Sequence, residues 1–291
     1  MIGRVTHSTT EGWRIRRRRS DRRLRPRRAL IVGTGPAALQ AARELAGAGC
    51  AEVVLSVPTR GGALSAAGTL GGVARVLVGL DEAAPADVLI VCDEGHGTFA
   101  PGGGAGSAAL WAARHAPDAV LILLSVDGPA ACAEALRRSG LPPWSILAPG
   151  GMPLAAAVRA RLARRLGVDA SQIAAPVIGG GKAGMRPLPR YTTVAGIPLH
   201  EPCLGAGGSG AEAAQGTEPA DLVSAGVELA RAVLQDRREV HSCCAWVEGR
   251  FGIAGAFVTL PVPVGARGAE DPLPLRLSLE ERALLQRAAS A

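Results

Sequence analysis

Residues 29–38 read ALIVGTGPAA, and the architecture of the chain can be worked out from these ten residues. Residues 29–33 have the composition of a buried strand, and a segment of helical composition runs from Pro36 to Ala48. Between them lies the spacing G-x-G-x-x-G/A. Its first glycine allows a tight turn, its second admits a pyrophosphate to the backbone amides, and its third small residue permits close packing of helix on strand. The predicted dinucleotide-binding residues are Gly33, Thr34, Gly35, Pro36, Ala37 and Ala38.

Strands and helices alternate in the chain that follows this turn. Apolar strands are predicted at 52–57, 74–79, 87–92 and 119–126, with a helix at 107–114. Uniformly apolar strands that alternate with helices indicate a parallel sheet covered on both faces. We therefore predict an α/β fold whose residues 29–150 form an NAD(P)-binding Rossmann domain with a doubly wound parallel sheet.

The adenosine end of the predicted cofactor site departs from the usual pattern. An Asp or Glu is expected at the end of the second strand, where it binds the ribose hydroxyls. This strand ends in Val57, and its Glu52 lies at the opposite end. Arg60 follows, and an arginine there is either an acceptor for the 2′-phosphate of NADP or an ordinary solvated loop residue. NAD and NADP both stay open as cofactors, and so does a glycine turn kept for packing alone.

Positive charge is confined to an N-terminal arm, residues 1–28. The arm holds eleven arginines against two acidic residues, so of the formal net charge of +7 it carries +9 and the remaining chain carries −2. Such a run cannot bury enough surface to fold, and we predict that it is disordered. It is either an incidental extension or an attachment to nucleic acid or an anionic membrane. The nearly neutral remainder argues against a nucleic-acid-binding domain.

The composition predicts neither a membrane span nor a metal site. No window of 18 uncharged apolar residues occurs, and a span needs about that many. The six cysteines include no CxxC pair, which argues against a structural zinc site. Reduced, mostly buried thiols in a cytoplasmic protein are the expectation. Four histidines stand isolated in the sequence, without metal-ligand spacing: His96, His115, His200 and His241.

Residues 176–199 read PVIGGGKAGMRPLPRYTTVAGIPL and resemble the segment that carries the catalytic histidine in malate and lactate dehydrogenases. In that family two glycines precede the histidine, and some members continue with Pro-Arg-Tyr-Ser/Thr-x-x-Gly-x-Pro. This chain keeps Gly179, Gly180 and the PRYTTVAGIP run, but Gly181 occupies the histidine position and Lys182 follows it. Glycine has no side chain, so it cannot move a proton.

A helical segment at 151–168, GMPLAAAVRARLARRLGV, resembles the family's Leu-Asp-x-x-Arg-x-Arg helix. Leu154 occupies the position of the Asp that partners the histidine. Ala157 occupies the position of the arginine that binds the substrate carboxylate. Arg159 matches the family's second, non-catalytic arginine, and two residues along a helix turn a side chain by about 200° to another face.

Other segments extend the resemblance over roughly residues 29–280 and include further departures from it. Residues 114–151 resemble the family's Ser-Asn-Pro strand end and the helix after it, with Val126 in place of the Asn that positions nicotinamide and substrate. The loop at 92–107 has none of the arginines that this loop brings to the substrate in active members. Segments that match the family's C-terminal part lie at 216–234, 244–261 and 277–288. Residues 151–291 are accordingly expected to form the family's α+β C-terminal domain.

Oxidation of a 2-hydroxy acid needs a base for the hydroxyl proton, an arginine that holds the carboxylate, and a positive donor for the oxygen. The resemblance implies that this chain lacks all three. Our main hypothesis is a homo-oligomeric malate/lactate dehydrogenase-like pseudoenzyme with a binding, structural or regulatory role. An alternative is an active NAD(P)-dependent oxidoreductase on another substrate, with Lys182 as its reactive group. A second alternative is a nucleic-acid-associated protein that acts through the arginine arm.

Overall fold

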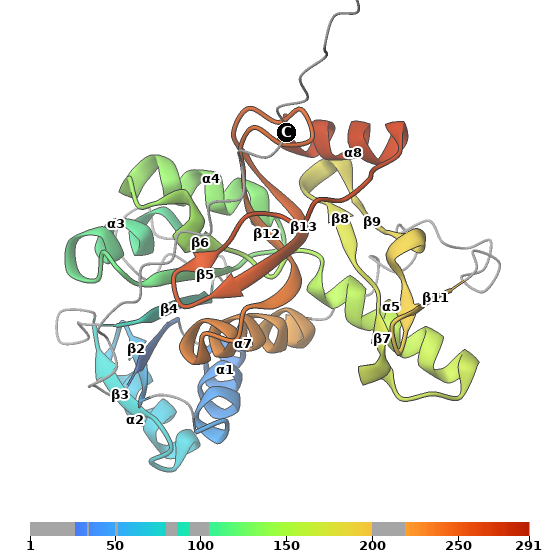
Figure 1. Cartoon of the computed structure of the whole chain (residues 1–291). Coiled ribbons are helices and arrows are strands. Elements are labelled where there is room, and N and C mark those ends of the chain that lie inside the picture. Colours follow the sequence, from blue (N-terminus) through green and yellow to red (C-terminus); the bar gives the residue numbers. More distant parts are fainter. Residues whose placement is uncertain are drawn as a thin grey trace, which may run out of the picture.

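The structure is a computed structural model that describes residues 27–33, 35–49, 52–79, 86–92, 105–199 and 219–290. Six parallel strands form its first sheet (Figure 1): β1 (Arg28–Val32), β2 (Glu52–Val57), β3 (Arg75–Val78), β4 (Val88–Cys92), β5 (Val120–Leu124) and β6 (Ile146–Leu147). Their order is β3-β2-β1-β4-β5-β6, which is the doubly wound order of dinucleotide-binding folds. The predicted Rossmann sheet is therefore confirmed.

Helices cover both faces of this sheet because alternate residues of each strand point to opposite sides. The connecting helices are α1 (Pro36–Gly47), α2 (Arg60–Leu70), α3 (Ala105–His115) and α4 (Gly128–Ser139). Ile31 and Ile90 belong to the buried cluster that includes residues of α1 and α2. Leu30 and Leu89 belong to the cluster formed with α3 and α4. Burial on both sides explains why the strands are uniformly apolar.

Helix α2 is a feature that the sequence did not predict. Its sequence, RGGALSAAGTL, is rich in glycine, which weakens a helix. The helix forms because Thr59 caps it, accepting a hydrogen bond from the Gly62 amide at 3.1 Å, and because Ala66 and Leu70 are buried against the sheet. Arg60 is therefore the first residue of a helix and not a loop residue.

The described residues of the second half form two antiparallel sheets and three long helices. The helices are α5 (Met152–Leu166), α7 (Pro219–Gln235) and α8 (Leu279–Ala289). The larger sheet contains β12 (Glu239–Val247), β13 (Ala256–Gly265), β8 (Val177–Gly179), β9 (Met185–Pro187) and β14 (Gly268–Ala269). The smaller sheet contains β7 (Ile173–Ala174), β10 (Thr193–Val194) and β11 (Ile197–Pro198). This α+β arrangement agrees with the fold class expected for the C-terminal part.

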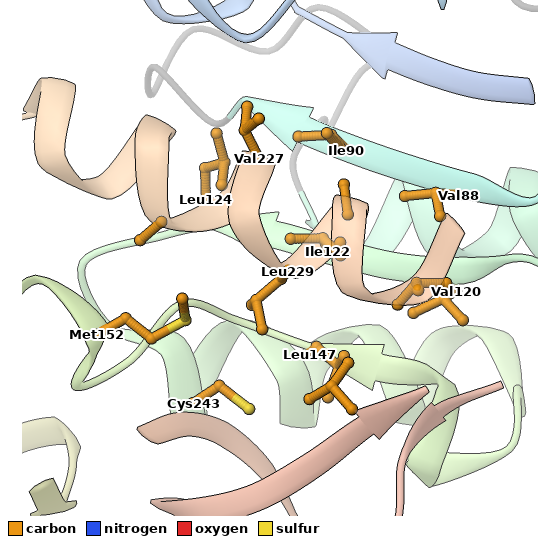
Figure 2. Close-up of a cluster of buried hydrophobic side chains, with 14 of the residues drawn as sticks. Val88, Ile90, Val120, Ile122, Leu124, Leu147, Met152, Val227, Leu229 and Cys243 are labelled. Atoms are coloured by element: carbon orange, nitrogen blue, oxygen red, sulfur yellow. The ribbon is translucent and has the colours of Figure 1, made fainter. Parts of the chain in front are cut away.

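One buried cluster joins the two halves. Helix α7 packs on the same face of the parallel sheet as α1, and Figure 1 shows the two helices side by side. Figure 2 shows Val227 and Leu229 of α7 beside Ile90 and Ile122 of the parallel sheet, with Cys243 of β12 nearby. The predicted boundary at 150 and 151 divides the chain into two sets of elements, but those sets share this core.

The end of the arginine arm takes part in the fold. Arg28, predicted to lie in the disordered arm, is the first residue of β1. It forms an ion pair with Glu52 at 2.8 Å, and its amide donates to Asp87 at 2.9 Å. Arg27 donates to the Val233 carbonyl of α7 at 2.9 Å. The expected disorder therefore does not apply to these two residues, because backbone pairing of Arg28 and the side-chain contacts of both arginines fix them. Residues 1–26 lie outside the described part.

Candidate functional site

The glycine turn lies at the carboxyl end of β1, in the middle of the parallel sheet. Gly33 and Gly35 have φ angles of 150° and 92°, which favour glycine. A Cβ at Gly33 would lie 2.9 Å from Cβ of Cys92, and Ala38 is completely buried beneath the turn. Gly35 and Pro36 begin α1 without a side-chain cap, and such a helix start favours a pyrophosphate. Thr34 lies outside the described residues, while Ala37 is the second residue of α1.

The carboxyl end of β2 lies beside this turn. The Gly33 amide donates to the Ser56 carbonyl at 3.3 Å, and the Gly79 amide after β3 donates to the Val57 carbonyl at 2.9 Å. Val57 is 3% exposed and belongs to the core, while Arg60 is exposed. The position expected to hold a ribose-binding acid is therefore apolar and filled.

A second group of segments meets farther along the same edge of the sheet, around the tripeptide Gly179–Gly181. Asp127, between β5 and α4, lies beside Gly181, whose added Cβ would be 3.6 Å from the Asp127 Oδ1. A Cβ at Gly180 would be 3.0 Å from Cγ of Pro129. Gly179 pairs with Thr259 of β13. The turn after β5, the end of β8 and the middle of β13 therefore converge at one place.

The backbone from Gly179 to Gly184 is folded into a tight loop that glycine alone adopts easily. Four glycines there have φ angles between 53° and 133°, in the region that L-residues avoid. The Gly180 amide donates to the Gly184 carbonyl at 2.8 Å, and the Gly184 amide donates to the Gly181 carbonyl at 3.2 Å. The loop therefore differs in conformation from a segment built to hold a side chain at 181.

Helix α5 presents no polar group from its two predicted site positions. Leu154 is 2% exposed and packs with Val158 and Val177 in a separate apolar cluster. Ala157 is exposed and can neither donate a hydrogen bond nor carry charge from its side chain. These two positions and Gly181 therefore lack the groups that proton transfer and carboxylate binding require.

Thr259 places a buried hydroxyl among these segments. Its side chain is fully buried, and its Oγ1 has no hydrogen-bond partner among the described residues. A Cβ at Gly150 would be 2.7 Å from this oxygen, so only a glycine fits there without a shift. Sequence patterns did not single out Thr259, because only the strand pairing brings it to the glycine loop.

Comparison with known proteins connects this site with a family. The malate dehydrogenase of Thermomicrobium roseum is 36% identical to this chain over 192 residues, which are 62% of each chain. Over this stretch the chain is similar to malate dehydrogenases. The malate dehydrogenase of Nitratiruptor is 33% identical over 186 residues, 60% of this chain and 58% of that protein. The chain thus spans about 60% of the length of the curated relatives it matches, and no family model matches it.

Solved structures agree in fold over nearly the whole chain. The lactate dehydrogenase of Cryptosporidium parvum superposes with a TM-score of 0.78 at 24% identity, covering 92% of this chain and 96% of that one. The same enzyme with lactic acid and nicotinamide adenine dinucleotide gives a TM-score of 0.76 at 22% identity, with the same coverage. The malate/lactate dehydrogenase fold is therefore present from the glycine turn to the C-terminal helix.

The protein also has a buried histidine whose partners the sequence did not reveal. His241 of β12, predicted to stand isolated, has its Nδ1 3.9 Å from Oε1 of Glu228 and its Nε2 3.5 Å from Oε2 of Glu239. Burial lowers the pKa of His241 and Arg159 opposes protonation as well, while the two carboxylates partly offset them. Arg159 of α5 therefore lies near enough to β12 for its charge to act on His241.

The cysteines of this dehydrogenase relative are not poised for chemistry. Cys92, Cys132, Cys243 and Cys244 are buried, as expected, and none of these four belongs to a disulfide. Burial raises the pKa of Cys243, and burial together with the neighbouring Cys132 and Asp127 raises the pKa of Cys244. Thiols that stay protonated are poor nucleophiles. In the described part of the chain, no group of three or more His, Cys, Asp or Glu side chains could hold a metal ion.

Several predicted features lie outside the described residues: the arm at 1–26, loop residues 93–104 with His96, and His200. The side chain of Lys182, the candidate reactive group, is also not described. None of the helices in the described part is long and apolar enough to cross a membrane.

Proposed function

We propose that this protein binds a nicotinamide dinucleotide and does not oxidise 2-hydroxy acids. The observation that carries the proposal is Gly181: it occupies the predicted base position in a loop of glycines, directly beside Asp127. Leu154 and Ala157 supply neither an acid partner nor a carboxylate-binding cation. The protein would then act as a binding or regulatory member of its family.

Loss of either the catalytic base or the carboxylate-binding arginine would slow a 2-hydroxy acid dehydrogenase. Loss of both leaves little of that activity. General base catalysis contributes about 10²- to 10⁴-fold to a rate. An arginine that fixes the substrate carboxylate contributes by holding the reacting carbon at the right distance from the nicotinamide. Leu154 suits the absence of a histidine, because a buried carboxylate without its partner would be destabilising.

Dinucleotide binding is supported by features that the site has kept. Strands β1, β4 and β5 are neighbours and parallel, so the glycine turn and the Asp127 turn lie on one edge, separated by about 10 Å across two strand spacings. A nucleotide whose pyrophosphate lies at Gly35 can therefore reach toward Gly181. The lactate dehydrogenase of Cryptosporidium parvum, which has this fold, has been solved with nicotinamide adenine dinucleotide and lactic acid.

Two measurements on the full chain test the two parts of the proposal. Calorimetric titration and thermal melting with NAD, NADH, NADP and NADPH should show saturable binding and a raised melting temperature, because a ligand of the folded state stabilises it. Reduction of oxaloacetate and pyruvate, followed by the absorbance of the reduced cofactor, should stay at the rate of a protein-free control. A malate dehydrogenase of known activity serves as the positive control.

The outcomes separate the alternatives. Ordinary turnover of oxaloacetate or pyruvate would overturn the proposed loss of activity. Failure to bind any dinucleotide at millimolar concentration would overturn the proposed binding role.

We further propose a homo-oligomer, as the resemblance implies. Light scattering on the protein as it elutes from a size-exclusion column should give at least twice the mass of one chain. The mass of a single chain would contradict the proposed homo-oligomer.

A further inference from the structure

The carboxyl ends of β1, β2 and β3 form the place where the adenosine half of a dinucleotide lies in this fold. Hydrogen bonds tie these three ends together: Gly33 to Ser56 at 3.3 Å, Gly79 to Val57 at 2.9 Å, and the Ser56 hydroxyl to the Gly79 carbonyl at 2.6 Å. The geometry next to the glycine turn is therefore well defined, and the residues that follow β2 are those that meet the ribose.

An acceptor for the ribose hydroxyls is missing from the described residues at this edge. Val57 ends β2 and points into the core, where it is 3% exposed. Glu52, the acidic residue of the same strand, lies about 17 Å away at the other end of β2, and Arg28 holds it there through two hydrogen bonds of 2.8 and 3.0 Å. Neither residue can accept hydrogen bonds from the 2′- and 3′-hydroxyls.

A cation follows shortly after the position where the acid would be. Arg60 lies three residues beyond Val57, is exposed, and forms no ion pair or hydrogen bond with any other residue of the described part. Thr59 is already occupied as the cap of α2, because its Oγ1 accepts from the Gly62 amide at 3.1 Å. A guanidinium next to the ribose attracts a phosphate, whereas a carboxylate there would repel it.

We infer that the protein takes a 2′-phosphorylated dinucleotide, NADP(H), in preference to NAD(H), and that Arg60 is the residue that reads the phosphate. The inference rests on the proposed dinucleotide binding and specifies its ligand class. It depends on the sign of the charge at this edge and on the absence of a carboxylate among the described strand ends, and not on any group near Gly181.

Calorimetric titration of the full chain with NADPH and NADH measures the preference directly. We expect NADPH to bind about tenfold more tightly than NADH, the difference that one charge-assisted contact supplies. Arg60→Gln should bring the two affinities close together by weakening NADPH binding, and Arg60→Lys should keep part of the preference. Raised salt should weaken NADPH binding more than NADH binding.

Arg75→Gln is the matched control. Arg75 is an exposed arginine at the start of β3, at the amino ends of the strands and away from the glycine turn. Its replacement by Gln changes the net charge by the same amount as Arg60→Gln. The ratio of the two affinities within each variant is the readout, because partial unfolding lowers both and leaves the ratio unchanged. The inference would be overturned if NADH bound as tightly as NADPH, or if Arg60→Gln left the ratio of the NADPH and NADH affinities unchanged. The proposed dinucleotide binding would stand in either case. Binding of neither cofactor would overturn the inference and the proposed function together.

Discussion

At the scale of single residues, the site is defined by glycines whose conformations other residues avoid. Gly181 has a φ angle of 53° and Gly180 one of 133°. The backbone at 181 therefore follows a course that a histidine would oppose. A point substitution toward the family pattern meets both a strained backbone and missing partners.

Gly181→His should destabilise the fold without creating activity. A side chain at this positive φ costs about 1–2 kcal/mol, and Leu154 and Ala157 still leave a histidine without its partners. Chemical denaturation and the oxaloacetate assay measure the two effects. Gly181→Ala should lose a similar amount of stability, while Gly68→Ala, inside α2 with open space around it, should gain up to about 1 kcal/mol. Restored turnover in Gly181→His would contradict the proposed loss of activity.

Thr259→Val should leave stability unchanged or raise it by about 1 kcal/mol. The Thr259 hydroxyl is buried without a partner in the described part, and an unsatisfied buried hydroxyl is destabilising. Equilibrium unfolding in urea measures the difference. Thr259→Ser keeps the hydroxyl and removes the methyl group, so it should be less stable than the natural protein. A clear loss of stability in Thr259→Val would mean that a bound group satisfies this oxygen.

At the scale of elements, α5, α7 and β12 meet around a charge cluster in which His241 is buried and Glu228 and Glu239 are exposed. Arg159 comes from α5, Glu228 from α7, and Glu239 and His241 from β12. Only the packing of these three elements creates the cluster, since its members are up to 82 positions apart in the chain. Because His241 belongs to this cluster and can take up a proton, we expect the packing of α5, α7 and β12 to depend on pH.

Stability should fall as pH decreases below about 6.5 in a way that depends on His241. Its folded pKa is lowered from 6.5, mainly by burial, so the unfolded chain binds the proton more readily. The contribution is fully present above the unfolded pKa and is lost as pH falls toward the folded pKa. Urea unfolding at several pH values should show a shallower decline for His241→Gln. His115→Gln, at an exposed position of α3, is the control. Equal slopes for His241→Gln and the natural protein would show that other groups set the dependence.

At the scale of the whole molecule, the parallel sheet and the C-terminal elements are stabilised by one core. Leu229 of α7 is fully buried in the cluster that contains Ile90, Ile122 and Leu147 (Figure 2). A helix that begins 72 positions after the last Rossmann strand thus covers the same face as α1. The two halves are expected to unfold together.

Leu229→Ala should destabilise the whole chain by about 2–5 kcal/mol, the range for a buried leucine. Circular dichroism in the near and far ultraviolet should then shift together in a single transition. Leu279→Ala, at a side chain that is 86% exposed, should change stability by less than about 0.5 kcal/mol. Two separate transitions, only one of which responds to Leu229→Ala, would show that the halves fold independently.

Local sequence determined the parts of the structure that depend on near neighbours. The strands around 29–33, 52–57 and 87–92 follow from apolar runs, and the turn at Gly33 and Gly35 follows from glycine spacing, because backbone sterics and burial act over a few residues. Leu154 and Ala157 lie on α5, within the helical segment predicted at 151–168. Helix α2 escaped prediction, because its glycines oppose a helix that the Thr59 cap and burial of Leu70 against the sheet nevertheless form.

Only the tertiary structure decided which distant residues meet. Strand order brings the turn after β5 to the glycine loop after β8, so that Asp127 lies beside Gly181. Strand pairing buries Thr259 at the same place, and helix packing surrounds His241 with charge. These contacts join segments that are tens of positions apart, and their formation depends on how whole sheets and helices pack. No pattern within one segment specifies that packing, which is why the sequence predicted the elements and only the fold assembled the site.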